Sequence, residues 1–466
     1  MTKTLFDEFE SVSAKAWKQK IQVDLKGADY NETLLTKTDE GIDIKPFYHA
    51  DNLDEKFKLP QTQHWSITEK IYLENTDISV ENAQDVINRG AESLWIIIPE
   101  ADSKKLAFFE AFKDEKIEIY VEFLFLDLDF LEKFNDTISK QNLKVRFGID
   151  PVAHLASDGN WFSNQKKDFE NILKINEFSN FINHINIDAR IYQNSGANIT
   201  QQLAYSLAHL NEYFNIFNEK SQRNKTLNIN LLISVGAHYF MEIAKIKALK
   251  LLVESLASKY DFEIELNIIA EPSSRNHTIY DYNMNMLRTT TACMSAILGG
   301  ADWVNNLAYD VIFHKRNEFG ERISRNQLLI LKQESYFDKV KNPVDGTYYI
   351  ENLTQELAEK SLSIFKNIEA GGGFIQQLFE GKVQKKIKES ADKEKAKIQS
   401  GESTLVGTNK HKNPEDKMGH DLELYPFLKQ NKRKTLVQPI IPKRLAEDIE
   451  LARLDEEQQA SSTENR

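Results

Sequence analysis

Three polar residues in one short loop have the types that acid–base chemistry uses. Arg275, His277 and Asp281 follow an apolar run and precede a helical pattern. An imidazole beside a carboxylate and a guanidinium can move a proton and bind an anion. The same residues have structural uses, because Asp281 can cap the helix expected over Asn283–Leu298 while Arg275 or Arg288 pairs with it. We favour this structural interpretation, in which the loop is locked rather than catalytic.

Few other residues offer chemistry. Asp310 follows a polar strand end and is the best remaining candidate for a functional acid. His238 starts a helix at another strand end, where we expect it to be partly buried and hydrogen-bonded. The single cysteine, Cys293, lies in a predicted helix, which favours a packed thiol and excludes a cysteine-cluster metal site. Gly371-Gly-Gly373 has no preceding strand and no following Lys-Ser/Thr, so we interpret it as a helix joint rather than a phosphate loop.

The first of these loops belongs to a strand–loop–helix–strand unit. Residues 262–270 are typical of a buried strand, and residues 281–298 have apolar side chains at helical spacing. Gly299-Gly300 ends that helix, and a further strand follows. In barrels and open α/β sheets, chemistry is located at the carboxyl ends of parallel strands. The loop therefore lies where a catalytic centre is expected if the chain has one.

The alternation of strands and helices runs through most of the chain. Seven apolar strands are expected, at residues 94–98, 117–125, 145–149, 185–187, 227–235, 262–269 and 303–307. Apolar strands joined by helices are typical of a parallel sheet covered on both faces. Without a Gly-x-Gly-x-x-Gly turn, this α/β rhythm predicts a (β/α)8 TIM-type barrel rather than a doubly wound sheet. For the eighth strand, Tyr348–Ile350 and Leu405–Val406 compete.

Two further regions flank the predicted barrel, which with its following helices covers residues 66–407. Residues 1–65 combine an amphipathic helix, Leu5–Leu25, with a short hairpin. Because two short elements cannot enclose a core, we expect an arm that contacts another subunit. Residues 408–466 are expected to form a C-terminal extension with a helix at Leu445–Leu454 and a disordered tail from Glu456.

Composition limits the function classes. The 466 residues are 41% hydrophobic and 28% charged, which is typical of a soluble globular protein. The net charge of −12 argues against nucleic acid as a partner. The chain has no apolar run of bilayer-spanning length and no secretion or transit pattern at its N-terminus. We therefore expect a cytoplasmic protein without a membrane partner.

Several motifs occur in one order along nearly the whole chain. They are Trp17-x3-Ile21 with Asp24-Leu-Lys-Gly27, Gly41-Ile-x-Ile-x-Pro46, Phe240-Met-Glu-Ile-Ala-Lys245, Arg275-Asn-x-Thr278-x2-Asp281, Asn285-Met-Leu-Arg288-Thr-Thr290, Arg325-Asn-Gln, Asn342-Pro-x-x-Gly346 and Val406-Gly-x-Asn409. From about Phe6 to Arg453 the chain resembles the methylmalonyl-CoA mutases, and specifically their small (beta) subunit. We expect structural roles for the motif positions in the loop, which are Arg275, Thr278, Asp281, Asn285 and Arg288.

The resemblance implies a large subunit that threads a CoA thioester through its barrel. That subunit holds adenosylcobalamin in a separate C-terminal domain, through the His of an Asp-x-His-x-x-Gly motif. No histidine of this chain stands in that motif, so we expect no C-terminal cobalamin-binding domain here. Catalytic subunits carry Ser-Gly-Tyr-His where this chain has Asp188-Ala-Arg190-Ile191. Ile191 thus replaces the His that bonds the thioester carbonyl, and its side chain cannot donate a hydrogen bond. The segment that supplies a carboxylate-binding Arg is here Asp158–Gln165, which has no Arg.

These features predict the non-catalytic small subunit of a heterodimeric, adenosylcobalamin-dependent methylmalonyl-CoA mutase, which interconverts methylmalonyl-CoA and succinyl-CoA in propionate metabolism. The chain would stabilise the large (alpha) catalytic subunit, with Phe6, Phe9 and Trp17 of the arm against it. We expect no catalytic, cofactor-binding or metal residues here, and adenosylcobalamin only through the large subunit. The alternatives are a self-sufficient barrel enzyme acting on an acyl-CoA through unrecognised residues, and an assembly with a separate cobalamin-binding chain, against which Ile191 argues.

Overall fold

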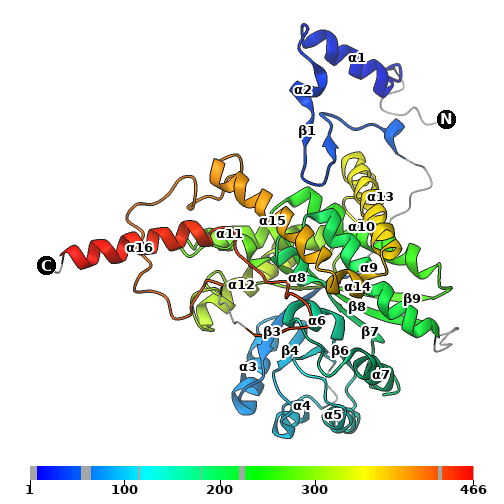
Figure 1. Cartoon of the computed structure of the whole chain (residues 1–466), viewed down its shortest axis with the longest axis vertical. Coiled ribbons are helices and arrows are strands. Elements are labelled where there is room, and N and C mark those ends of the chain that lie inside the picture. Colours follow the sequence, from blue (N-terminus) through cyan, green and yellow to red (C-terminus); the bar gives the residue numbers. More distant parts are fainter. Residues whose placement is uncertain are drawn as a thin grey trace.

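A barrel of eight parallel strands forms the centre of the computed structural model, which describes residues 8–53, 64–113, 116–178, 180–219, 226–428 and 433–464 (Figure 1). The strands are β3 (Ser66–Tyr72), β4 (Ser93–Ile98), β5 (Glu118–Phe123), β6 (Val145–Gly148), β7 (Ile185–Asp188), β8 (Leu227–Val235), β9 (Ile264–Pro272) and β10 (Trp303–Asn305). They follow one another around the barrel in chain order, and β10 is hydrogen-bonded to β3. The predicted TIM-type α/β barrel is confirmed.

The eighth strand of the barrel is β3, and neither of the two predicted candidates is correct. Tyr348–Ile350 begins helix α13 (Tyr348–Ala370), and Leu405–Val406 lies outside the barrel, with only an isolated bridge from Val406 to Lys410. The sequence of β3 has three consecutive polar residues, Thr68, Glu69 and Lys70, between its two isoleucines. A search for continuous apolar runs overlooks such a strand, because Lys70 faces the barrel axis rather than the helices.

Side chains close the seam between β6 and β7, where no strand ladder forms. The backbone N–H of Phe147 donates to Asn183 Oδ1 over 2.7 Å, and Asn183 Nδ2 donates to the Phe147 carbonyl over 2.9 Å. At the carboxyl end of the seam, the backbone N–H of Asp188 donates to the carboxylate of Asp150 over 2.8 Å. These bonds satisfy backbone groups that the interrupted ladder leaves free.

Helices surround the barrel and bury the outer faces of its strands in one large apolar core (Figure 1). They are α3 (Thr76–Asn88), α4 (Ala107–Glu110), α5 (Leu128–Lys140), α6 (Pro151–Asp158), α7 (Gln165–Ile175), α8 (Arg190–Asn194), α9 (Ile199–Glu219), α10 (Tyr239–Ala257), α11 (Met284–Gly299) and α12 (Glu318–Leu329). Helix α13 packs across α9 and α10 as an additional layer. It is followed by α14 (Phe374–Phe379) and α15 (Lys382–Ser400).

The N-terminal arm lies away from the barrel (Figure 1). It contains α1 (Ala14–Asp24), α2 (Tyr30–Leu34) and a hairpin of β1 (Thr36–Lys37) and β2 (Asp43–Ile44). Helix α1 begins later than predicted because Ser13 Oγ accepts a hydrogen bond from the N–H of Ala16 and caps it. None of its residues is buried. The hairpin attaches to the body through Asp39, whose carboxylate pairs with Lys393 at 2.7 Å and Lys397 at 3.0 Å.

The C-terminal segment crosses the carboxyl face of the barrel. The N–H groups of Val437 and Ile440 donate to carbonyls of the α6 region, and that of Leu445 donates to the carbonyl of Arg275. Helix α16 (Glu447–Glu464) then projects from the body (Figure 1). The disordered tail predicted from Glu456 is therefore helical as far as Glu464. Cooperative extension of α16 overrides the polar composition that suggested disorder.

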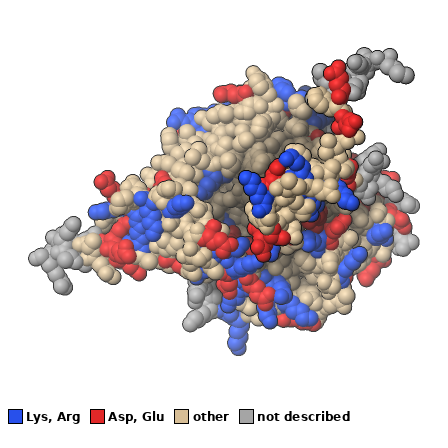
Figure 2. All heavy atoms as spheres, turned by 90° about the horizontal axis from the view of Figure 1, so that it is seen from above, with Lys and Arg blue, Asp and Glu red and all other residues tan. Residues whose placement is uncertain are grey.

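Charge is mixed on the molecular surface. On the face drawn in Figure 2, basic and acidic side chains alternate over short distances. None of the helices in the described part of the chain combines the length and apolar character needed to cross a bilayer.

Candidate functional site at the barrel axis

Inward-facing residues of the barrel strands are largely polar or aromatic. Because side chains alternate along a strand, every second residue points to the axis while the others pack under the helices. Near the carboxyl ends these inward residues form a group that we call the axial cluster. It consists of Lys70 on β3, Trp95 on β4, Glu122 on β5, Asp188 and Arg190 at the end of β7, and Glu271 on β9.

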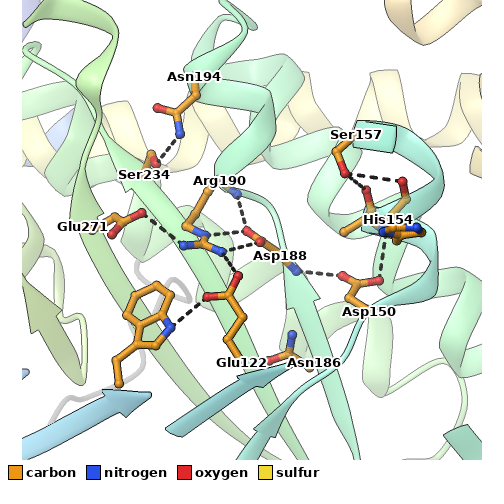
Figure 3. Close-up of polar contacts among 12 residues, drawn as sticks. Glu122, Asp150, His154, Ser157, Asn186, Asp188, Arg190, Asn194, Ser234 and Glu271 are labelled. Atoms are coloured by element: carbon orange, nitrogen blue, oxygen red, sulfur yellow. Dashed lines mark hydrogen bonds and ion pairs between the residues drawn. The ribbon is translucent and has the colours of Figure 1, made fainter. Parts of the chain in front are cut away.

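Arg190 is the centre of the axial cluster (Figure 3). Its Nη2 lies 2.9 Å from Glu122 Oε1, its Nε lies 2.7 Å from Asp188 Oδ1, and its Nη1 lies 3.2 Å from Glu271 Oε1. The side chain is only 14% exposed. Burial alone would lower the pKa of Arg190, yet the three carboxylates raise it well above the usual value. A permanently charged guanidinium therefore connects three strands of the barrel.

Lys70 and Trp95 complete the cluster. Lys70 pairs with Glu271 Oε2 and lies 3.8 Å above the Trp95 ring, a cation–π geometry. Trp95 Nε1 donates to Glu122 Oε2 over 2.8 Å. Burial alone would raise the pKa of Glu271, but Lys70 and Arg190 hold it below its usual range. Glu271 is thus ionised, and the carboxylates of the cluster are all engaged with fixed partners.

The axis below the cluster is also filled. Trp95, Tyr120, Leu232, Ile269 and Trp303 form a buried layer across the barrel. Tyr120 Oη donates to Asn186 Oδ1 over 3.2 Å. Nearer the amino ends, the guanidinium of Arg146 lies 5.8 Å from the Trp303 ring centre. The described residues on the inner faces of the strands thus form a packed core along the axis.

Three motif residues of the loop after β9, Thr278, Asn285 and Arg288, form one hydrogen-bonded group. Asn285 Oδ1 accepts from the N–H of Thr278 at 3.1 Å and from Arg288 Nη1 at 2.8 Å. Arg288 Nη2 donates to the carbonyl of Val406 over 2.7 Å. Arg275 lies apart from this group, with its guanidinium paired to Glu394 at 2.8 Å and bonded to the Lys443 carbonyl at 2.6 Å. These bonds tie the loop to the C-terminal segment.

Asp281 does not act as the predicted side-chain cap. Helix α11 begins at Met284, its N-cap residue Asn283 makes no side-chain cap bond, and the N–H of Met284 donates to the backbone carbonyl of Asp281. Neither Arg275 nor Arg288 forms a described ion pair with Asp281. Its backbone has a φ of +46° and its N–H donates to Asp416 over 2.6 Å. The loop is held by backbone turns and by the C-terminal segment rather than by a carboxylate cap.

The other sequence candidates have structural surroundings. Asp310 is 2% exposed, and its carboxylate accepts from Asn317 Nδ2 at 2.8 Å and lies 3.1 Å from His314 Nδ1. His238 precedes α10 and is exposed rather than partly buried. Cys293 is buried within α11, where burial raises the pKa of its thiol far above the usual value. None of these three residues reaches the axial cluster.

His277 is the most unusual residue of the loop. It has no exposed surface, and neither ring nitrogen has a hydrogen-bond partner among the described residues. Burial, followed by the charges of Arg288 and Arg444, lowers its pKa to about 3. The ring is therefore neutral in the folded chain at any physiological pH.

We expect His277 to make the protein acid-sensitive. In the unfolded chain an imidazole titrates near pH ~6.5, so below that pH the unfolded state binds a proton that the folded state does not. Stability from this group is complete above that pH and falls by about 2 kcal/mol between pH 7 and pH 5. Urea unfolding at pH 7 and pH 5 should show that the free energy of unfolding falls more between these pH values in the wild type than in His277→Leu. Parallel pH profiles would mean that the imidazole has a partner in solution.

The family follows from comparison with known proteins. The methylmalonyl-CoA mutase family model matches residues 130–456. The chain belongs to the methylmalonyl-CoA mutase family. It is 28% identical over 460 residues to the methylmalonyl-CoA mutase small subunit of Porphyromonas gingivalis, which covers 90% of this chain and 73% of that protein.

Longer mutases match about half of the chain. The methylmalonyl-CoA mutase of Cereibacter sphaeroides is 34% identical over 236 residues, 49% of this chain and 33% of that protein. The probable methylmalonyl-CoA mutase large subunit of Mycobacterium bovis is 31% identical over 253 residues, 52% of this chain and 33% of that protein. The matched stretch therefore spans only a third of the length of these longer relatives.

Sequence reasoning located Arg190 and Ile191 but not the partners of Arg190. Ile191 is 9% exposed and packs in the main core. Lys70, Glu122 and Glu271 come from three other strands, and nothing local in the sequence joins them. A period-two pattern of polar residues within apolar strands was the available indication, as in Glu118, Tyr120 and Glu122 of β5.

Proposed function

We propose that this chain is the non-catalytic small subunit of a heterodimeric, adenosylcobalamin-dependent methylmalonyl-CoA mutase. Its role is to stabilise a large subunit that binds the CoA thioester and the cofactor. The observation that carries the proposal is the filled barrel axis: Arg190 and its carboxylate partners occupy the space along which a thioester would have to pass. Together with Ile191, this arrangement supports a structural rather than a catalytic role.

The residues at the carboxyl face do not fit a cobalamin. A lower axial ligand requires an accessible imidazole nitrogen. His209 and His277, the imidazoles buried under this face, have no exposed surface. His314 lies between the carboxylates of Asp310 and Asp421. His238 and His154 also lie at this face and are less buried, but neither stands in an Asp-x-His-x-x-Gly motif, which supports assigning adenosylcobalamin to the large subunit.

The N-terminal arm is the proposed contact with the large subunit. Trp17 and Val23 lie on helix α1, which has no buried residue, and their exposed fractions are 49% and 72%. Phe9, which precedes this helix, is 74% exposed. An apolar arm without a core of its own gains free energy by burying this surface in a partner. Phe6, the other residue of the predicted face, lies outside the described residues.

Trp17→Asp is expected to abolish assembly while leaving the barrel intact. Co-expression with the large subunit of the same genome, followed by size exclusion, should give a heterodimer for the wild type and separate chains for the variant. The melting temperature of the isolated variant should not change, because Trp17 is half exposed and its ring contacts Phe47, which also belongs to the arm. Ile78→Asp, at a 57% exposed position on α3, is the matched control and should still assemble. A wild-type chain that remains alone beside the large subunit contradicts the proposal.

Calorimetry separates this role from a self-sufficient acyl-CoA enzyme. Titration of the isolated chain with methylmalonyl-CoA and succinyl-CoA should give no binding heat, because Arg190 blocks the axis. Micromolar binding or turnover by the chain alone would instead establish the enzyme.

A further inference from the structure

A cleft of about 340 Å³ opens beside the axial cluster, at the carboxyl ends of β5, β6 and β7. Its floor is formed by Tyr120, Gly148 and Asn186, and helix α6 forms one wall with His154 and Ser157. Gly148 makes room for the floor, since a Cβ there would lie 2.1 Å from Tyr120 Oη. The volume is within the range of small-molecule sites. The cleft shares Glu122 and Asp188 with the axial cluster but extends away from the axis toward α6, and it has no part in the proposed subunit role.

The cleft carries uncompensated negative charge. Four carboxylates line it, those of Glu122, Asp150, Asp158 and Asp188, against one lining cation, Arg433, which pairs with Asp158. In the adjoining axial cluster, the three carboxylates of Glu122, Asp188 and Glu271 face only two cations, Arg190 and Lys70. The imbalance of at least one negative charge favours a cationic ligand, because the surrounding protein focuses the field into the cleft.

Asp150 adds to this charge from below. Burial alone would raise its pKa, but His209, 3.0 Å away, and backbone N–H donors hold the pKa of Asp150 below its usual range. Tyr213 Oη also donates to this carboxylate over 2.7 Å. Asp150 is thus an ionised group that lines the cleft at neutral pH.

The other lining groups favour an organic cation over a metal ion. Within the described residues, no group of three or more His, Cys, Asp or Glu side chains is arranged to hold a metal. Phe162 and the ring of His154 stack at 3.8 Å and give the cleft a flat, partly apolar wall. Asn186 is 3% exposed, its Oδ1 accepts from Tyr120, and its Nδ2 donates no hydrogen bond within the described residues. A buried amide donor therefore remains available at the floor.

We propose that this cleft binds a small organic cation, with an ammonium or guanidinium group against Glu122 and Asp188 and an apolar portion against Phe162. An acceptor atom on the same ligand would take the free N–H of Asn186. In Figure 3, Glu122 comes from β5, Asn186 and Asp188 come from β7, and His154 lies on α6. The ligand is thereby held between strand ends and a helix, as in other barrel sites.

Three probes of one shape test the proposal on the full chain. They are the 2-phenylethylammonium ion, neutral 2-phenylethanol and the 3-phenylpropanoate anion, each titrated by ligand-observed NMR at low salt. The cation should bind saturably and at least about tenfold more tightly than the alcohol, since the charge contributes the preference. The anion should not bind. Equal binding of cation and alcohol, or no binding of the cation, would overturn the proposal.

Two matched variants locate the site. Ser157→Arg places a bulky cation on the wall of the cleft and should abolish binding of the probe. Ser139→Arg adds the same side chain at an exposed position on α5 and should leave binding unchanged. Near-UV circular dichroism of both variants confirms that they remain folded. If Ser157→Arg binds as well as Ser139→Arg, the probe occupies another site and the proposal is wrong.

Discussion

Arg190→Met is expected to lower the free energy of unfolding by about 3–5 kcal/mol, because three buried carboxylates lose their shared counter-ion. Glu122, Asp188 and Glu271 all lie within 3.2 Å of the guanidinium. Methionine fills most of the volume but returns none of the hydrogen bonds. Lys70 can then neutralise only Glu271, with which it already pairs. Guanidinium chloride unfolding at pH 7 measures the loss.

The pH dependence of this loss identifies its electrostatic origin. Without Arg190, mutual repulsion raises the folded-state pKa of the three carboxylates above that in the unfolded chain. A group with a raised folded pKa takes up protons on folding, so the defect should shrink as the pH falls from 7 toward 5. Arg89→Met, at a 45% exposed position paired with Asp85, is the control and should change stability little. A loss that is small, or that is constant with pH, would show that the axial cluster is not a buried charge network.

The barrel could be predicted because the apolar layer between its strands and helices produces recognisable patterns within short stretches of sequence. Each of the seven predicted strands presents apolar residues to the helices, and these runs are visible without any knowledge of their neighbours. Strand β3 departs from this pattern because Glu69 and Lys70 interrupt it. Glu69 faces α12, where Arg325 Nη1 lies 3.2 Å away. Such a partner is 256 residues distant along the chain, so local patterning cannot identify the strand.

The candidate site was predictable only in part for the same reason. The register of the family motif located Arg190 and Ile191 where a catalytic subunit has Tyr and His. It did not indicate that Arg190 would bind carboxylates from β5 and β9, because these pairings depend on the closure of the barrel. The cleft beside the cluster depends on closure as well, since Gly148 and Asn186 meet only across the β6–β7 seam.

For the motif loop after β9, the sequence predicted the residue types but not their partners. Its residues were correctly expected to be polar and close to a helix start, but their partners lie in the C-terminal segment. Asp281 fits against Gly407, where a Cβ would lie 2.7 Å from the Asp281 Cβ. One motif of the chain thus fits against another, and this contact joins the loop to the segment that crosses the barrel mouth.

Gly196→Ala is expected to lower the free energy of unfolding by about 2–5 kcal/mol, the second large effect. Gly196 has a φ of +94°, which costs an L-residue about 1–2 kcal/mol. A Cβ there would also lie 2.6 Å from Arg275 Nη2 and 2.6 Å from Ala391 Cβ. Arg275 is 5% exposed, so displacing it separates a buried guanidinium from Glu394 and from the Lys443 carbonyl, at a further cost of about 1–3 kcal/mol.

Three further variants separate the backbone cost of Gly196→Ala from the steric one. Gly401→Ala has a φ of +78° and nothing within 4 Å of the added Cβ, so it should show only the backbone cost of about 1–2 kcal/mol. In an Arg275→Ala background, Gly196→Ala should cost less than in the wild type, because the clash with the guanidinium is gone and only that with Ala391 Cβ remains. Urea unfolding of the four variants completes the cycle. Additive effects at Gly196 and Arg275 would mean that the guanidinium does not pass over Gly196, and that the lock between the barrel mouth and the C-terminal segment does not depend on this close approach.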